Sequence, residues 1–314
     1  MNKQIFFTLL VIMTFTLIAC TKKEAALTPS EEDQGYVVPQ GTNDYDATIV
    51  NFYNKFGSYL LYEFTDKDTY WTPSGWKNAT PSATAAGAWN PGYEVIKANP
   101  LYIKKQLALL DTTWFRYYTD KFLNEYLPTK IMLCTKVDSV YSTVISFSPI
   151  TYLKNAKAVA AWYNYDNICV NNAGPAIDTM KAADKKAYTG KVNLIFAQSI
   201  IGRKLVKATT DFSSVANYGV TYTTYAAAYG QGILYPYSSS PTADLDWGYY
   251  ILAMVSMSET NLNTSTANTD ATFKGILNAT KDVNGKIRTR YNLIRNYYIT
   301  NYNVDLQAIG NAAN

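Results

Sequence analysis

One stretch constrains the fold more than any other: residues 191–205, KVNLIFAQSIIGRKL. Apolar side chains occupy nearly every side of the helix that this stretch would form, which is typical of a helix in the middle of a protein core. Residues 181–191 add a polar approach, and the two segments together make about seven turns of 3.6 residues each. The sequence therefore predicts a buried central helix. Its apolar residues are Val192, Leu194, Ile195, Phe196, Ala197, Ile200, Ile201 and Leu205.

A buried helix of this kind is where a zinc peptidase places two histidines one turn apart. The whole chain contains no histidine. Ser-His-Asp and Cys-His catalytic arrangements, and every metal site that depends on histidine, are therefore excluded. The sequence also has no glycine-rich dinucleotide motif, P-loop or EF-hand pattern. We expect a protein that holds no metal and no cofactor.

Residues 1–20, MNKQIFFTLLVIMTFTLIAC, have the anatomy of a secretory signal. Lys3 precedes an apolar run that is too short for a transmembrane span. The ending Leu17-Ile18-Ala19-Cys20 resembles the lipobox of bacterial lipoproteins, in which the cysteine becomes the acylated first residue. We predict a signal peptide over 1–19 and a lipid anchor on Cys20. The alternative is an ordinary signal peptide with a chance cysteine.

A flexible tether is predicted over residues 20–42, because 21–35 is polar, contains Pro29 and has no aromatic residue. Some twenty flexible residues span roughly 25 Å. The folded part would begin at residue 43 and is long enough for one large domain or two small ones. With 48% hydrophobic residues, the chain can bury a substantial core.

The charge balance excludes nucleic acid as a partner. The chain has 28 basic and 24 acidic residues, a net charge of +4, and removal of Lys3 with the signal would leave +3. That charge is too small and too dispersed for a nucleic-acid surface. Cys134 and Cys169, the cysteines beyond the anchor, are too few for a structural zinc site. Buried thiols on nearby strands and a disulfide are equally compatible with their positions.

Hydrophobic periodicity predicts a mostly helical body with one small β-sheet before the central helix. The expected strands are 130–137, 140–147 and 156–170. Weak helical character is expected over 213–229, and a loop over 230–242. The expected helices, besides the central one, are 43–62, 101–126, 244–258, 270–281 and 286–302, with a short final helix after residue 303.

The segment 65–100 is long and rich in small residues and proline, and three tryptophans lie in it. Long loops in compact domains are usually functional or disordered. We predict that Trp71, Trp76 and Trp89 contact a ligand. The alternative is that these rings pin the loop onto the body.

Acidic residues offer few candidates for catalysis. Glycosidases need two carboxylates at a suitable separation, and Asp244 with Asp246, or the run Glu31-Glu32-Asp33, would qualify by residue type alone. The first pair is expected to cap a helix and the run lies in the tether, so we assign no catalytic residue.

The order of elements resembles a family of Bacteroidetes lipoproteins, the substrate import-associated zinc metallohydrolases. The resemblance covers FYNKFG at 52–57 with LYEF at 61–64, and the helix end Tyr126-Leu127-Pro128. It is clearest at the C-terminus, in YNLI at 291–294 and YNVDL at 302–306. It implies a zincin-like α+β fold, with a metallopeptidase-like domain over 43–314, and a place near outer-membrane nutrient importers.

Active members of that family carry HExxH in the central helix and a further carboxylate in a later acidic-aromatic segment. The matching positions here fall near residues 195–200 and at Asp246-Trp247-Gly248-Tyr249. Both histidines and the general-base glutamate are replaced, mainly by apolar residues. The resemblance therefore implies the fold and a pseudoenzyme, and it carries over no zinc site.

These observations predict a non-catalytic, lipid-anchored protein on the periplasmic or the cell-surface face of the outer membrane. It would assist the binding and import of a glycan or peptide, beside a TonB-dependent importer and its binding lipoprotein. One alternative is a hydrolase, a peptidase or glycosidase, that uses carboxylates not yet identified. Another is a structural envelope lipoprotein, which would present an exposed apolar patch and no ligand-sized cleft.

Overall fold

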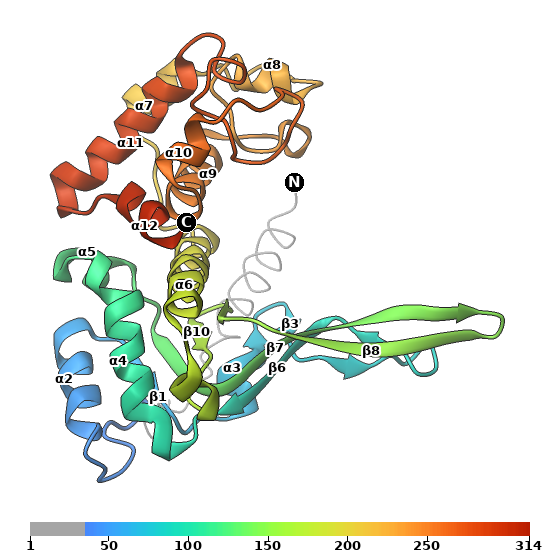
Figure 1. Cartoon of the computed structure of the whole chain (residues 1–314), viewed down its shortest axis with the longest axis vertical. Helices are drawn as coiled ribbons and strands as arrows, with labels where there is room; N and C mark the ends of the chain where they lie inside the picture. The colour runs from blue at the N-terminus through green and yellow to red at the C-terminus, as the bar shows by residue number, and fades with distance from the viewer. Residues whose placement is uncertain (1–34) are drawn as a thin grey trace, which may run out of the picture. The chain divides into compact units, whose positions relative to one another are not determined.

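The computed structural model describes residues 35–314 (Figure 1). The predicted signal peptide, the predicted lipidation site Cys20 and the acidic run at 31–33 lie outside the described residues. A compact unit begins at Val38. The Oε1 atom of Gln40 accepts hydrogen bonds from the backbone N–H groups of Tyr62 (2.8 Å) and Glu63 (3.0 Å). Residues 38–42, predicted as the end of the tether, therefore lie against the folded domain.

Helices and strands are mixed along the chain, so the expectation of an α+β protein is confirmed. Short 3₁₀ turns lie at Pro100–Tyr102, Phe115–Tyr117, Pro175–Thr179 and Tyr237–Ser239. The helices are α2 (Asp46–Phe56), α3 (Asp66–Tyr70), α4 (Ile103–Thr113), α5 (Asp120–Tyr126), α6 (Ala182–Gly202), α7 (Thr210–Val215), α8 (Tyr225–Tyr229), α9 (Ala243–Ser256), α10 (Glu259–Asn263), α11 (Lys286–Tyr302) and α12 (Leu306–Ala313). The strands are β1 (Tyr59–Leu61), β2 (Trp71–Thr72), β3 (Gly75–Trp76), β4 (Thr80–Pro81), β5 (Trp89–Asn90), β6 (Gly92–Lys97), β7 (Lys130–Phe147), β8 (Ile150–Ala158), β9 (Ala161–Tyr163) and β10 (Asn167–Val170).

Strand β7 organises the main sheet because it pairs with four other strands. Its first residues pair in parallel with β1 and with β10, so that Ile131 lies between Leu60 and Ile168. Its middle residues, 134–140, pair antiparallel with β6, and residues 138–147 pair antiparallel with β8. Strand β9 ends the sheet and pairs antiparallel with β10.

The two strands predicted at 130–137 and 140–147 form one continuous strand, β7. Asp138 and Ser139 fall between the two expected strands. In the structure Asp138 is buried within the sheet, where Lys136 Nζ lies 2.8 Å from its carboxylate and offsets the charge. The expected strand over 156–170 comprises the end of β8 together with β9 and β10, and the first residues of β8 were not predicted.

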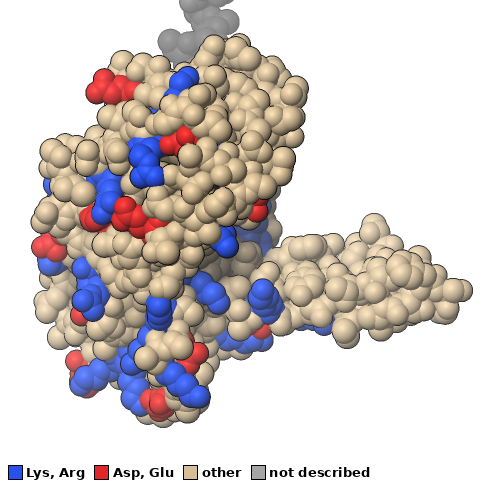
Figure 2. All heavy atoms as spheres, turned by 45° about the horizontal axis from the view of Figure 1, so that its top comes forward, with Lys and Arg blue, Asp and Glu red and all other residues tan. Residues whose placement is uncertain are grey.

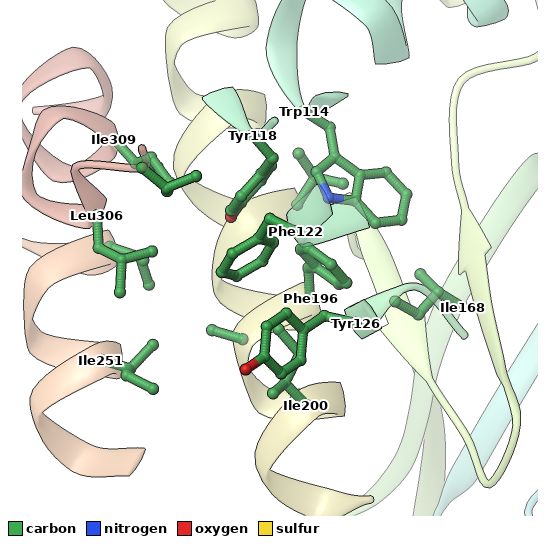
Figure 3. Close-up of a cluster of buried hydrophobic side chains, with 14 of the residues drawn as sticks. Trp114, Tyr118, Phe122, Tyr126, Ile168, Phe196, Ile200, Ile251, Leu306 and Ile309 are labelled. Atoms are coloured by element: carbon green, nitrogen blue, oxygen red, sulfur yellow. The ribbon is translucent and has the colours of Figure 1, made fainter. Parts of the chain in front are cut away.

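Helix α6 is the predicted central helix, and it packs against β9 and β10 as well as α9 and α12. Its fully buried Phe196 lies among aromatic rings from the preceding helices (Figure 3). The ring centroids of Trp114 and Tyr118 each lie 5.2 Å from that of Phe196, and the ring of Phe122 lies 6.2 Å away. Aromatic pairs in such edge-to-face geometry stabilise a core beyond their buried area.

The single helix predicted over 101–126 is divided into α4 and α5. The backbone leaves helical geometry at Trp114, and the hydroxyl of Thr119 caps α5 by accepting a hydrogen bond from the N–H of Phe122. Trp114 and Phe122, which lie on either side of this division, both pack against Phe196. Tertiary packing here overrides the periodicity of the sequence.

Two further expectations fail in the C-terminal part. Residues 270–281 form turns rather than a helix. Gly275 has a φ of +75°, and the buried Lys281 Nζ donates to the carbonyl oxygen of Thr272 at 2.7 Å. The weakly helical segment 213–229 contains two short helices, α7 ending at Val215 and α8 beginning at Tyr225.

The segment 65–100 is more structured than the sequence predicted. It holds helix α3, the two-stranded sheets β2–β3 and β4–β5, and strand β6 of the main sheet. Within residues 35–314, no helix is both long enough and apolar enough to cross a bilayer.

Candidate functional site

A cleft of about 1210 Å³ lies beside the C-terminal half of α6. The helix contributes Ile195, Gln198 and Gly202 to its wall. Strand β9 and the residues after it, together with β6, β7 and the β3 region, form the other walls. Those residues are Trp76, Lys77, Pro91, Gly92, Tyr93, Thr129, Ser139, Val140, Tyr141, Trp162, Tyr163, Asn164, Tyr165 and Asp166, and Arg203 and Lys204 follow the helix.

Aromatic rings dominate the walls opposite α6. The ring of Tyr93 stacks on that of Trp162, with centroids 4.1 Å apart and planes inclined by 13°. Burial raises the pKa of Tyr93, so its phenol keeps its proton and can donate a hydrogen bond. The rings of Trp76, Tyr141 and Tyr165 are exposed. Rings with an apolar face and a polar tip, next to a few polar groups, are typical of ligand pockets.

Arg203 lies in the lining, but its guanidinium is already bound by the protein. It donates to the backbone carbonyl oxygens of Tyr126, Leu127 (3.1 Å) and Ser199 (3.3 Å). Burial lowers the pKa of Arg203 to about 10. The side chain therefore joins the C-terminal ends of α5 and α6, and its role in the cleft is structural.

The charges that remain free in the cleft are positive. Asp166 is the one carboxylate among the lining residues, and Lys130 Nζ lies 3.0 Å from it. Lys77 and Lys204 are exposed, and neither forms an ion pair with any residue in the part of the chain that the structure describes. A glycosidase mechanism needs two carboxylates, and this lining contains one.

The structure separates the three tryptophans predicted to bind a ligand. Trp76 lines the cleft. Trp71 lies opposite Trp76 in the β2–β3 pair, outside the lining, and its ring meets that of Tyr165 edge-on at 6.1 Å. Trp89 also lies outside the lining, and Lys154 Nζ sits 3.6 Å from its ring centroid. Packing thus accounts for the contacts of Trp71 and Trp89.

Asp246 was expected to cap helix α9, and this expectation is wrong. The hydroxyl of Thr242 caps the helix by accepting a hydrogen bond from the N–H of Leu245. The Asp246 carboxylate is fully buried and accepts hydrogen bonds from Arg290, from Tyr218 Oη (2.9 Å), and from the N–H groups of Leu234 and Tyr235 (2.7 and 2.8 Å). Four donors occupy it, so it has no capacity left for a metal.

The carboxylate of Asp244 does not cap helix α9 either. Its carboxylate accepts hydrogen bonds from Lys207 Nζ and from the N–H of Ala208, each at 2.9 Å. It therefore joins the start of α9 to the chain that leaves α6. Asp244 and Asp246 do not face a common cavity, and neither lines the cleft.

The segment 195–200 has two different surroundings. Ile195 and Gln198 line the cleft, whereas Phe196, Ala197, Ser199 and Ile200 are buried in the core. Across residues 35–314, no three histidine, cysteine, aspartate or glutamate side chains are grouped so that they could hold a metal ion. Cys134 and Cys169 are buried free thiols on the neighbouring strands β7 and β10.

Most of the aromatic wall was not predicted from the sequence. Tyr93 lies on β6, and Trp162, Tyr163 and Tyr165 lie on and after β9. A signal was present in AWYNYDN at 161–167, where three of the seven residues are aromatic and two are asparagines. Their proximity to α6 depends on the pairing of β9 with β10, which local sequence does not specify.

No family model matches the chain. No curated protein matches it. Among solved structures, the chain is similar to a candidate zinc-binding metallo-peptidase from Bacteroides caccae, with 11% sequence identity and a TM-score of 0.46. The match covers 87% of this chain and 93% of the Bacteroides chain. The zinc binding in that description belongs to the Bacteroides protein.

Proposed function

We propose that this protein is a non-catalytic lipoprotein of the outer membrane, a degenerate metallopeptidase homologue that binds a glycan or peptide for import. The observation that carries the proposal is the composition of the cleft. The wall formed by α6 presents Ile195 and Gln198, and the opposite walls are aromatic. Such a cleft offers ring faces and polar tips to a ligand. Lipidation of Cys20 would hold it at the membrane, and an importer would receive the ligand.

The family resemblance supports the same proposal from the sequence side. It places the zinc ligands of active members on the central helix near 195–200, and no histidine occurs anywhere in this chain. A hydrolase that uses carboxylates alone would need a second acidic residue beside Asp166 in the cleft. A structural lipoprotein would need no cleft of ligand size, so binding is the function that the geometry favours.

The proposal is tested by screening the purified protein against glycans and peptides and measuring each hit by calorimetry. Trp76→Ala should weaken binding at least tenfold, or about 1.4 kcal/mol, because its exposed ring lines the cleft. Phe147→Ala is the matched control, since this ring is also exposed but lies outside the cleft lining. Equal affinities for Trp76→Ala and the unaltered protein would reject the cleft as the binding site.

Catalysis and the importer are tested separately. Hydrolysis of a bound ligand that survives EDTA and is abolished by Asp166→Asn would show an enzyme instead of a binding protein. Crosslinking in intact cells, followed by mass spectrometry, should recover a TonB-dependent importer and its binding lipoprotein. Recovery of abundant envelope proteins alone would argue against the import role and leave a free-standing binder.

A further inference from the structure

Strands β7 and β8 continue as a two-stranded hairpin beyond the last pairing of β7 with β6, at Val140 and Gly92. We call residues 141–155 the hairpin arm; it projects from the rest of the folded unit (Figure 1). No charged residue occurs between positions 139 and 153. Figure 2 shows the outer part of the arm in tan, with lysines where the arm meets the body.

The tip of the arm exposes large apolar side chains. Phe147 and Ile150 form the last cross-strand pair before the turn, and their exposed fractions are 83% and 60%. Ile145 is 59% exposed. Apolar groups gathered at the end of a projecting element, with no core beneath them, indicate a surface that something else covers.

Side chains change along the arm in a definite order. Behind the apolar tip comes Tyr152 and then Lys154, whose ammonium group already pairs with Glu94. Tyr141 lies one pair further back than Lys154, and the exposed Lys157 lies behind Tyr141. Apolar groups at the tip, with aromatic and basic side chains behind them, match the way side chains cross from the hydrocarbon of a bilayer to its headgroups.

We propose that the tip of the hairpin arm inserts into the surface of a lipid bilayer. At about 3.3 Å per residue, the pairs from Phe147 back to Thr143–Leu153 span about 10–13 Å. Interfacial segments reach a shallow depth of about 5–10 Å, which takes in the pairs from the tip back to Val144–Tyr152. Deeper insertion would carry the unpaired backbone edges of a two-stranded hairpin into hydrocarbon, which is costly. Lys157, behind the inserted part, would then lie on the headgroup side.

Another protein strand is a poorer partner for this surface. The hairpin register shifts between Val144 and Ser146, which places a bulge at Ile145, and Pro149 lies in the turn. Bulges and prolines at exposed strands prevent the pairing of one edge with another. A bilayer needs no strand register, so it accepts the same apolar tip with its bulge.

The inference goes beyond the proposed function, since the tip residues 144–153 take no part in the cleft lining. It adds a second attachment to the predicted lipid anchor. Trp76→Ala should therefore leave insertion of the arm unchanged, whereas it should weaken ligand binding. The two proposals fail separately.

The test uses the full lipidated chain in vesicles of phosphatidylethanolamine and phosphatidylglycerol. Phe147→Cys is labelled with an environment-sensitive fluorophore, and Val283→Cys, at a position 58% exposed and distant in sequence, is the control. Cys134 and Cys169 are buried, and the unsubstituted chain measures any background labelling. The label at 147 should shift its emission to the blue and be quenched by lipid-borne nitroxides, while the label at 283 stays accessible to aqueous iodide.

Two results would overturn the proposal. The first is a label at 147 that stays accessible to iodide on vesicles. The second is a label at 147 that becomes protected without lipid as the protein concentration rises, because the tip would then contact a second copy of this chain. Phe147→Ser with Ile150→Ser should abolish lipid quenching of a label at Ile145→Cys and leave the folding transition in urea intact, since all three side chains are exposed.

Discussion

Asp246 of α9 and Arg290 of α11 form an ion pair in which both side chains are fully buried. Arg290 also donates to the hydroxyl of Tyr218 and to the carbonyl oxygen of Gly232, and its guanidinium lies 3.5 Å from the ring centroid of Phe212. One buried pair thus connects two helices and the loop between α8 and α9.

Replacing Asp246 with asparagine should destabilise the protein strongly. The change leaves the Arg290 charge buried without a counter-charge, and removing one member of a buried pair costs about 3–5 kcal/mol. The free energy of unfolding in urea measures the effect. Asp244→Asn is the matched control on the same helix, because its ion pair with Lys207 is largely exposed and such pairs contribute less than about 1 kcal/mol.

The double change Asp246→Leu with Arg290→Met separates charge from packing. It removes both buried charges and keeps apolar volume, so it should destabilise less than Asp246→Asn alone. A double variant as unstable as the sum of the two single variants would show that the hydrogen bonds, rather than the unpaired charge, account for the loss.

Gly310→Ala should destabilise the docking of the last helix. A Cβ atom at this position would overlap the backbone carbonyl oxygens of Met254 and Met257, which cannot rotate away. Separation of α12 from α9 should cost at least about 2 kcal/mol in urea unfolding. Gly230→Ala, at the end of α8, is the control, since its Cβ would approach no neighbour closer than 3.4 Å, and this change should stay within about 1 kcal/mol of the unaltered protein.

Local sequence predicted the elements whose burial follows from their own periodicity. Helix α6 was expected from its apolar run, whereas the helix expected over 43–62 ends earlier, as α2 at Gly57, which adopts a left-handed conformation with a φ of +64°. The division of the helix at Trp114 had no signal in the local sequence, and the rings on either side of it pack against Phe196, about eighty residues later in the chain. The turns at 270–281 depend on the buried Lys281, which donates hydrogen bonds to Asp270 and Thr272 of the same loop.

The cleft was harder to predict than the fold for the same reason. Its aromatic stack joins Tyr93 to Trp162, and its helical wall carries Gln198. These residues become neighbours only through the pairing of β6 with β7 and of β9 with β10. Of the three tryptophans selected from the sequence, Trp76 alone lines the cleft; its cross-strand neighbour Trp71 does not, and nothing in the local sequence distinguishes the two.

Cys134 and Cys169 should be unreactive in the folded protein. Both thiols are buried on neighbouring strands. Burial is the main cause that raises the pKa of Cys134, and the hydrogen bond with the adjacent Cys169 thiol raises it further. Because the thiolate is the reactive form, a thiol reagent at pH 8 should modify neither residue until guanidinium unfolds the chain, and then both. Phe147→Cys, fully accessible at the arm tip, should react at once as a positive control. Prompt reaction of either native thiol would contradict the buried arrangement.

Acid should weaken the 264–285 loop through Asp270. Hydrogen bonds from the hydroxyl and the N–H of Thr272 lower the pKa of Asp270 from 3.8 to about 2. A carboxyl whose pKa is lower in the folded state contributes stability above the unfolded value of 3.8, and this contribution is lost as pH falls through about 2. Asp270→Asn should therefore be less stable than the unaltered protein at pH 7, and the difference should shrink between about pH 4 and pH 2.

Urea unfolding at pH 7, 4, 3 and 2 measures this difference, with Asp211→Asn as a control because its side chain is exposed and lies outside the loop. Other carboxyl groups titrate in the same range, so the comparison between variants carries the result. A stability difference that stays constant from pH 7 to pH 2 would contradict the role of Asp270.

The cleft should prefer ligands that carry an acidic group. Asp166 is offset by Lys130, and Arg203 is occupied by backbone carbonyls, so Lys77 and Lys204 set the charge that a ligand meets. Between a neutral glycan or peptide and its acidic counterpart, the acidic one should bind more tightly at low ionic strength. The difference should fall as salt rises, because exposed charges are screened within about 10 Å at 0.1 M.

The double variant Lys77→Ala with Lys204→Ala should remove the preference for the acidic ligand. Its affinity for the neutral ligand should stay within about twofold, since exposed lysine charges contribute little to the binding of an uncharged group. Lys104→Ala is the control, because this lysine pairs with Asp44 outside the cleft. A double variant that kept its preference for the acidic ligand would show that these lysines do not recognise the acidic group. Binding would then depend on the rings of Tyr93, Trp162 and Trp76 alone.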